Sequence, residues 1–140
     1  MEENYYNEKV ILPSEQSSLD IAENIIEKIR NRFNISKDSY FNILVAITEA
    51  INNAISHGNH YQINKKVKFE VTYMNELLDI VVQDEGGGFD PDELEDCTKE
   101  ENLLKDSGRG IFIMQSLSDK FEISTSSEGT CFRLVFKIPH

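Results

Sequence analysis

The stretch VKFEVTYMNELLDIVV, residues 67–82, carries the clearest structural pattern in this chain. Its first half alternates polar residues with four apolar ones, Val67, Phe69, Val71 and Tyr73. That period of two is typical of a strand with one buried face. The turn-like pair Asn75-Glu76 follows, and residues 77–82 then form a mainly apolar run. The stretch therefore predicts a β-hairpin.

Two amphipathic segments precede this hairpin. A short apolar run at residues 10–12, closed by Pro13, suits a first strand. A helix is predicted after it, ending at Asn34, because apolar residues recur at helical spacing: Leu19, Ile21, Ala22, Ile25, Ile26, Ile29 and Phe33. A second helix follows, capped by Ser36 or Asp38 and ended by Gly58. Its core-facing stripe is expected to be Phe41, Leu44, Val45, Thr48, Ile51 and Ile55.

Downstream of the hairpin, the pattern predicts a loop, a short helix and a second hairpin. Residues 92–107 are acidic and non-periodic, so we expect a loop there. Residues 108–117 suit a helix, and residues 121–125 and 131–136 suit strands that flank Glu128-Gly129. The order β-α-α-β-β-loop-α-β-β predicts an α+β fold, with a mostly antiparallel sheet covered by helices on one face.

Composition narrows the classes of function. The 140 residues suit one domain, and the formal charge of -11 would repel phosphate backbones, which argues against a nucleic-acid binder. No apolar run reaches the roughly 18–20 residues that cross a bilayer, and the acidic N-terminus does not resemble a signal peptide, so we expect a cytoplasmic protein. Cys97 and Cys131 stand far apart without metal-ligand spacing, which indicates neither zinc nor redox chemistry.

The first candidate site lies on the second predicted helix. Glu49 and Asn53 are four residues apart, so their side chains share one helix face. An amide oxygen is a hard ligand suited to Mg²⁺, and a carboxylate one turn away can deprotonate a hydroxyl nucleophile. A solvated polar face is the commoner explanation for such a pair. Adjacent Asn52 and Asn53 weaken that explanation slightly, because asparagine is a poor helix former.

The second candidate site is the segment DEGGG, residues 84–88, directly after an apolar strand. Asp84 can accept a hydrogen bond from an exocyclic amine, and the glycines let the backbone lie close to a ring. Adenine fits such a site. A plain loop is the alternative, and three glycines alone would favour it.

The third candidate site is Ser107-Gly108-Arg109-Gly110, which leads into a predicted helix. Free N–H groups at a helix N-terminus attract anions, and Arg109 can bind phosphate with two hydrogen bonds. Taken alone, the pattern also fits ordinary packing at a helix start. The chain lacks the complete glycine motifs of dinucleotide-binding and P-loop proteins and the catalytic motifs of eukaryotic-type kinases.

Together the three sites resemble the GHKL ATP-binding superfamily, and within it the small bacterial anti-sigma-factor serine/threonine-protein kinases. Residues 49–58 (EAINNAISHG) resemble the N box of that superfamily, residues 84–89 its G1 box and residues 107–111 its G2 box. Gly129-Thr130 resembles its late glycine-threonine pair. The resemblance implies one histidine-kinase-like ATPase domain over residues 1–140, with the two-layer α/β sandwich called the Bergerat fold and an ATP lid at about residues 92–107.

The resemblance also implies a role for each candidate residue. Asn53 would coordinate Mg²⁺ on the ATP phosphates, and Glu49 would be the catalytic base toward an acceptor hydroxyl. Asp84 would bind the adenine amino group. The rest of the implied ATP-binding set lines the base pocket (Gly86, Gly88), supports Asp84 through water (Thr130) or contacts the phosphates (Gly108, Arg109, Gly110).

Members of this family phosphorylate a serine or threonine on an anti-anti-sigma (STAS) protein and hold a sigma factor, commonly as homodimers. The resemblance therefore implies a kinase in a bacterial partner-switching system. A second reading is a nucleotide-dependent binding protein that sequesters its partner with little or no kinase activity. Asp106, where some members carry arginine before the G2-box serine, favours that second reading.

Overall fold

The computed structural model describes residues 4–62, 64–86, 106–127 and 129–139. Its elements follow the predicted order: strand β1 (Tyr5–Pro13), helices α1 (Ser18–Phe33) and α2 (Lys37–Asn53), π-helix η2 (Ala54–Gly58), strands β2 (Lys66–Met74) and β3 (Leu77–Gln83), helix α4 (Asp106–Leu117), and strands β4 (Lys120–Ser126) and β5 (Gly129–Lys137). Most of the predicted 92–107 loop lies outside the described residues.

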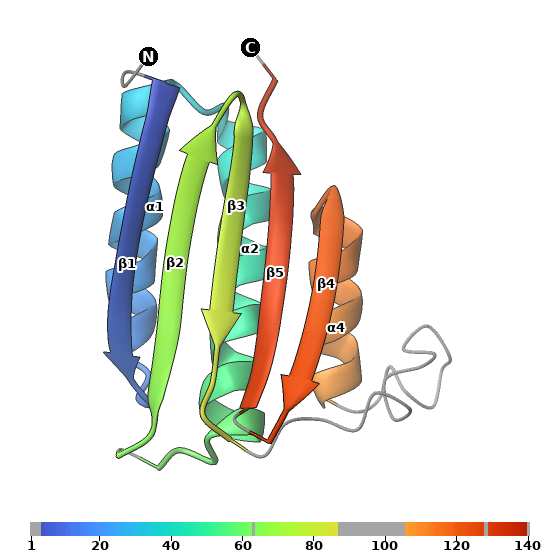
Figure 1. Cartoon of the computed structure of the whole chain (residues 1–140). Helices are drawn as coiled ribbons and strands as arrows, with labels where there is room; N and C mark the ends of the chain where they lie inside the picture. The colour runs from blue at the N-terminus through green and yellow to red at the C-terminus, as the bar shows by residue number, and fades with distance from the viewer. Residues whose placement is uncertain (1–3, 63, 87–105, 128, 140) are drawn as a thin grey trace.

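The strands form one five-stranded sheet in the order β1-β2-β3-β5-β4, and each described pairing is antiparallel. Helices α1, α2 and α4 all lie behind the sheet in Figure 1, and none of the described helices covers its other face. This arrangement confirms the predicted α+β sandwich of two layers. No parallel pairing occurs among the described strands, so the sheet is antiparallel there rather than mixed.

The 67–82 hairpin is confirmed, and its turn explains the register. Asn75 and Glu76 have φ angles of 54° and 64°, in the left-handed region. Two consecutive left-handed residues make the tight turn whose twist matches that of paired strands. Tyr73 therefore pairs with Leu78, and Phe69 pairs with Val82.

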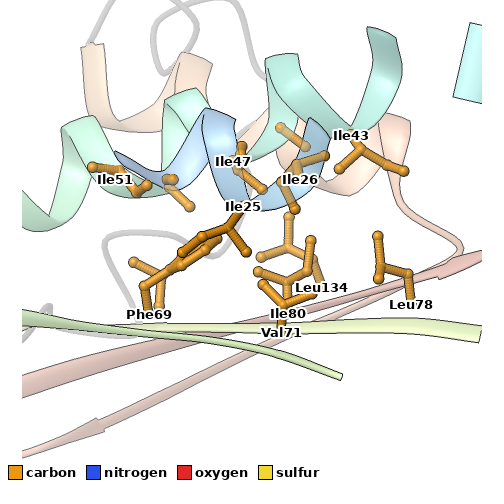
Figure 2. Close-up of a cluster of buried hydrophobic side chains, with 14 of the residues drawn as sticks. Ile25, Ile26, Ile43, Ile47, Ile51, Phe69, Val71, Leu78, Ile80 and Leu134 are labelled. Carbon is orange, nitrogen blue, oxygen red and sulfur yellow. The ribbon is translucent and has the colours of Figure 1, made fainter. Parts of the chain in front are cut away.

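The core lies between the two layers. Alternate residues of β2 and β3 are buried, as the period of two predicts: Val67, Phe69, Val71, Tyr73, Leu78, Ile80 and Val82. Figure 2 shows Ile25, Ile47 and Ile51 pointing from the helices toward Phe69 on the sheet. These side chains are almost entirely removed from water, which supplies the main driving force for folding.

The predicted core stripe of the second helix is confirmed at Ile51 and Ile55, which are both 0% exposed, and is wrong at its other four positions. Phe41 is 64% exposed, and Leu44, Val45 and Thr48 are only half-buried. The buried residues of α2 are instead Ile43, Ala46, Ile47, Ala50, Ile51 and Asn53. The prediction followed the bulky residues and passed over the alanines, which let a helix pack closely against its neighbours.

The helix ends are close to those predicted. Asn34 ends α1 in the left-handed conformation, with φ 55°. Ser36 rather than Asp38 caps α2, since its side chain accepts a hydrogen bond from the Ser39 N–H at 3.2 Å. Helix α4 starts at Asp106, two residues before the predicted start, so the glycines lie inside its first turns. No described helix is long and apolar enough to cross a membrane.

Candidate functional site

The end of α2 changes its helical form. After Asn53, residues Ala54–Gly58 form the π-helix η2, in which the Asn59 N–H donates to the carbonyl of Ala54 at 2.9 Å. A π-turn holds one residue more than an α-turn and often marks a functional site. Here it presents Gly58 to the end of β3: a Cβ atom at position 58 would lie 2.0 Å from Asp84 Oδ2. Only glycine leaves room for that carboxylate.

Asp84 is a buried carboxylate with one oxygen paired and one unpaired. It directly follows β3 and is 2% exposed. Its Oδ1 atom accepts hydrogen bonds from the N–H groups of Gly86 and Thr130, each at 3.0 Å. Its Oδ2 atom is buried and has no hydrogen-bond partner among the described residues. Oδ2 is therefore available to accept a hydrogen bond from a ligand.

Burial also sets the ionisation of this carboxyl. Desolvation raises the pKa of Asp84 above its ordinary value, and the two backbone N–H groups oppose that rise in part. A hydrogen-bond donor brought to Oδ2 would stabilise the charged form further. The site therefore favours a neutral or cationic donor group over an anion.

Two glycines close around Asp84. At Gly86, a Cβ atom would lie 1.6 Å from the carbonyl oxygen of Gly58. At Gly129, φ is 136°, and a Cβ atom would lie 2.1 Å from the backbone oxygen of Asp84. Any side chain at these positions would force the backbone apart, so the glycines permit the packing that holds the carboxylate.

A second group of residues lies one helical turn earlier. Asn53 is 3% exposed, and its Nδ2 donates to the backbone carbonyl of Glu49 at 2.8 Å. That bond turns the amide so that Oδ1 is buried without a partner among the described residues. Gly110 of α4 lies against the pair, since a Cβ atom there would be 2.6 Å from Asn53 Nδ2 and 2.9 Å from Glu49 Oε2.

The structure thus brings together residues from all three predicted sites. Glu49, Asn53 and Gly110 adjoin one another, and Asp84 adjoins Gly86 and Thr130. Thr130 donates its backbone N–H to Asp84, and the water-mediated contact expected of it stays a prediction. Arg109 is exposed on α4, Gly108 lies in the first turn of that helix, and Gly88 lies outside the described residues.

Sequence reasoning missed one residue of the site, Asn59. Its side chain is fully buried and bonds to the backbone of Glu85, the residue after Asp84. A single asparagine after a helix-ending glycine is common at helix ends, so the sequence alone gave no reason to select it.

Comparison with known proteins agrees with this geometry. The family model described as "Histidine kinase-like ATPase domain" matches residues 12–136. The serine-protein kinase RsbW of Oceanobacillus iheyensis is 24% identical over 127 residues, which cover 86% of this chain and 80% of that protein. The anti-sigma F factor of Bacillus subtilis is 35% identical over 104 residues, which cover 69% of this chain and 68% of that protein.

Solved structures share the fold. A crystal structure of the RsbU and RsbW domains of Rv1364c from Mycobacterium tuberculosis superposes with a TM-score of 0.70 at 13% identity. The match covers 95% of this chain and 32% of that longer one. The mycobacterial sensor histidine kinase MprB superposes with a TM-score of 0.57 at 15% identity, covering 94% of this chain and 97% of that one. By the family model and its relatives, this chain belongs to the histidine kinase-like ATPase family.

Proposed function

We propose that this protein binds Mg-ATP and transfers the γ-phosphoryl group to a serine or threonine of an anti-anti-sigma (STAS) partner in a bacterial partner-switching system. The observation that carries the proposal is that Asn53 Oδ1 and Asp84 Oδ2 are buried without a hydrogen-bond partner; they are two of three such side-chain atoms among the described residues, the third being Asn52 Oδ1. Asn53 is the last residue of α2, and Asp84 packs against Gly58, the last residue of η2. The two acceptors therefore lie at opposite ends of η2. Relatives named serine-protein kinase RsbW support the assignment of the reaction.

The Asp84 end suits the base of the nucleotide. An adenine 6-amino group can donate to Asp84 Oδ2, which otherwise stays buried without a partner. Gly86, Gly88 and Thr130 would complete this end of the proposed site. The unpaired acceptor favours adenine, because a base with a carbonyl in place of the 6-amino group would bring its oxygen against Asp84 Oδ2.

The Asn53 end suits the phosphates and a magnesium ion. The donor set fits Mg²⁺, because the buried Oδ1 of Asn53 is a hard oxygen ligand without a partner among the described residues. Those residues hold no group of three histidines, cysteines or carboxylates that could bind a metal, so phosphates and water would supply the other ligands. When bound, Mg²⁺ neutralises phosphate charge. Gly108, Arg109 and Gly110 would lie along the phosphates.

Glu49 is the proposed catalytic base. Its carboxylate lies beside the position of Gly110, on the same side of α2 as Asn53. It is half-buried, so a partner's hydroxyl can reach it. Glu49 would take the proton of that hydroxyl as the oxygen attacks, and the packing of α2 against α4 would hold the two groups in place.

A second function is favoured by a specific comparison. The relatives named anti-sigma F factor share 35% identity with this chain. The protein would then bind a sigma factor in a nucleotide-dependent way and transfer phosphate slowly or not at all. We also propose that the whole chain is one domain, that it acts in the cytoplasm, and that it forms homodimers.

One experiment separates the two functions. The purified protein is incubated with γ-labelled ATP, Mg²⁺ and the STAS protein encoded beside its gene, with EDTA and a serine-to-alanine acceptor as controls. We expect label on the acceptor serine of the intact partner and none in either control. Retained ATP binding without labelling would contradict the kinase and favour the binding protein. Failure to bind ATP or ADP would contradict both.

A further inference from the structure

Asn59 joins three segments that are far apart in the sequence. Its side chain is 0% exposed. Its Nδ2 donates to Ser14 Oγ at 2.9 Å and to the carbonyl of Lys66 at 3.0 Å, and its Oδ1 accepts the N–H of Glu85 at 2.8 Å. Both amide hydrogens and one acceptor position are therefore used, which fixes the orientation of the group.

Each of the three partners is itself held in place. Ser14, after the end of β1, donates from Oγ to the carbonyl of Lys65 at 2.6 Å. The N–H of Lys66, at the start of β2, donates to Glu85 Oε2 at 3.0 Å. Glu85 is thus bound through its backbone by Asn59 and through its side chain by Lys66.

This network fixes Asp84 from the helix side. Two consecutive residues contact two consecutive residues. Gly58 packs on the Asp84 carboxylate, and Asn59 accepts a hydrogen bond from the Glu85 N–H. From the sheet side, Thr130 accepts the N–H of Asp84 at 3.0 Å and donates its own N–H to Oδ1. Asp84 is therefore held on both sides: Thr130 binds its N–H and its carboxylate, and Asn59 binds the peptide that follows it.

Hydrogen bonds weaken steeply as their angle departs from linearity. Oδ2 of Asp84 can discriminate between bases only while its direction is fixed. Thr130 fixes the N–H of Asp84 and the carboxylate, whereas Asn59 is the side chain that fixes the following peptide. Release of that peptide would let the carboxylate turn.

We propose that Asn59 is a positioning residue for recognition of the nucleobase: through the Glu85 N–H, it holds Asp84 with Oδ2 directed at the exocyclic amine of adenine. This inference rests on the proposed binding of ATP. Asn59 does not touch the nucleotide, so its loss is expected to change selectivity between bases more than affinity for the phosphates.

The test compares two nucleotides that differ only at the amine. Dissociation constants for ATP and for purine riboside triphosphate, which lacks the 6-amino group, are measured by calorimetry with Mg²⁺. For the unmodified protein we expect ATP to bind about tenfold or more tightly, the value of one hydrogen bond to a charged group. For Asn59→Ala we expect the two constants to agree within about threefold.

Ser18→Ala is the matched control. It removes a buried hydrogen bond outside the network, from Ser18 Oγ to the carbonyl of Pro13 at 2.6 Å, and leaves the Asn59 to Glu85 bond in place. We expect its thermal stability to fall while its selectivity stays within about twofold of the unmodified protein. This control separates loss of stability from loss of positioning.

The outcomes are distinct. Folded Asn59→Ala with undiminished selectivity would overturn the inference, and so would an unmodified protein that binds both triphosphates equally. If the unmodified protein binds neither, the proposed function itself fails. If circular dichroism shows that Asn59→Ala is unfolded, Asn59→Ser, whose shorter side chain cannot reach partners on both sides, is judged on the same ratio.

Discussion

Gly110 of α4 lies directly against Asn53 of α2, so closely that a Cβ atom on Gly110 would be 2.6 Å from Asn53 Nδ2. The same atom would be 2.9 Å from Glu49 Oε2. A glycine in a helix normally weakens it, by about 1 kcal/mol relative to alanine. At this position the missing side chain leaves the space in which the two polar groups of α2 lie.

We therefore expect Gly110→Ala to separate folding from function. The contacts it would make are with the ends of two side chains, which can move, so the free energy of unfolding should stay within about 1 kcal/mol of the unmodified value. Displacement of Asn53 and Glu49 should weaken Mg-ATP binding about tenfold or more. Urea unfolding and calorimetry measure the two quantities. Ser116→Ala, at an exposed position on α4, is the control. Unchanged affinity of Gly110→Ala for Mg-ATP would contradict a role for the space beside Asn53 and Glu49.

Glu49→Gln should keep nucleotide binding and lose phosphoryl transfer. The amide has nearly the shape of the carboxylate but cannot take a proton, and general-base catalysis typically contributes about 100-fold or more. The rate of labelling of the STAS partner and the affinity for ATP are measured together. Glu27→Gln, exposed on α1, controls for loss of one negative charge. Equal transfer rates in the two variants would remove Glu49 from the role of base.

Asn53→Ala should abolish the part of ATP affinity that depends on Mg²⁺. The variant loses the buried Oδ1 proposed as the metal ligand, whereas contacts to the base remain. Calorimetric titrations with Mg²⁺ and with EDTA should differ in the unmodified protein and coincide in the variant. Asn42→Ala, exposed on the same helix, should behave as the unmodified protein does. A variant that still responds to Mg²⁺ would argue for another ligand.

Local patterns in the sequence predict much of this fold because its elements depend on near neighbours. The 67–82 hairpin follows from alternation and from a turn pair that tolerates left-handed angles. The buried carboxylate after β3 follows from one acid at the end of an apolar run. Glu49 and Asn53 follow from helical spacing alone, which places them together whichever side of α2 is buried.

The features that were missed depend on contacts between distant segments. The buried face of α2 depends on the sheet beneath it, and helical periodicity alone predicted only Ile51 and Ile55 of that face correctly. The π-turn at Ala54–Gly58 depends on the fit of Gly58 to Asp84. The role of Asn59 depends on its hydrogen bonds to Ser14 and Lys66, and Ser14 is 45 positions away in the sequence.

The corrected face of α2 can be tested by stability. Ile47 is 0% exposed above the sheet, so Ile47→Ala should lower the free energy of unfolding by about 2–5 kcal/mol. Phe41, which the sequence pattern placed in the core, is 64% exposed. Phe41→Ala should therefore change the free energy of unfolding by no more than about 0.5 kcal/mol. Urea unfolding at neutral pH compares the two variants. A larger loss of stability in Phe41→Ala than in Ile47→Ala would favour the core-facing residues predicted from the sequence.

Asp84→Asn should bind ATP more weakly. Its free energy of unfolding, compared with that of the unmodified protein, should increase as the pH rises. Burial raises the pKa of Asp84 above its ordinary value of 3.8, so between these two values the folded chain binds more protons than the unfolded chain. The free energy of unfolding of the unmodified protein therefore falls across this interval as the pH rises, an effect that asparagine removes. Asparagine Oδ1 still accepts from Gly86 and Thr130, but its Nδ2 donates where the adenine amine needs an acceptor.

Urea unfolding of Asp84→Asn and the unmodified protein from pH 3.5 to pH 8 measures this effect, about 1.4 kcal/mol for each pKa unit of the shift. The difference in unfolding free energy should move in favour of the variant with rising pH and become constant above the folded pKa. Asp20→Asn, exposed on α1, controls for the change in net charge. ATP affinity should fall about tenfold or more in Asp84→Asn alone. A stability difference that moves the other way would show that the folded protein favours the ionised carboxylate, and it would contradict a raised pKa of Asp84.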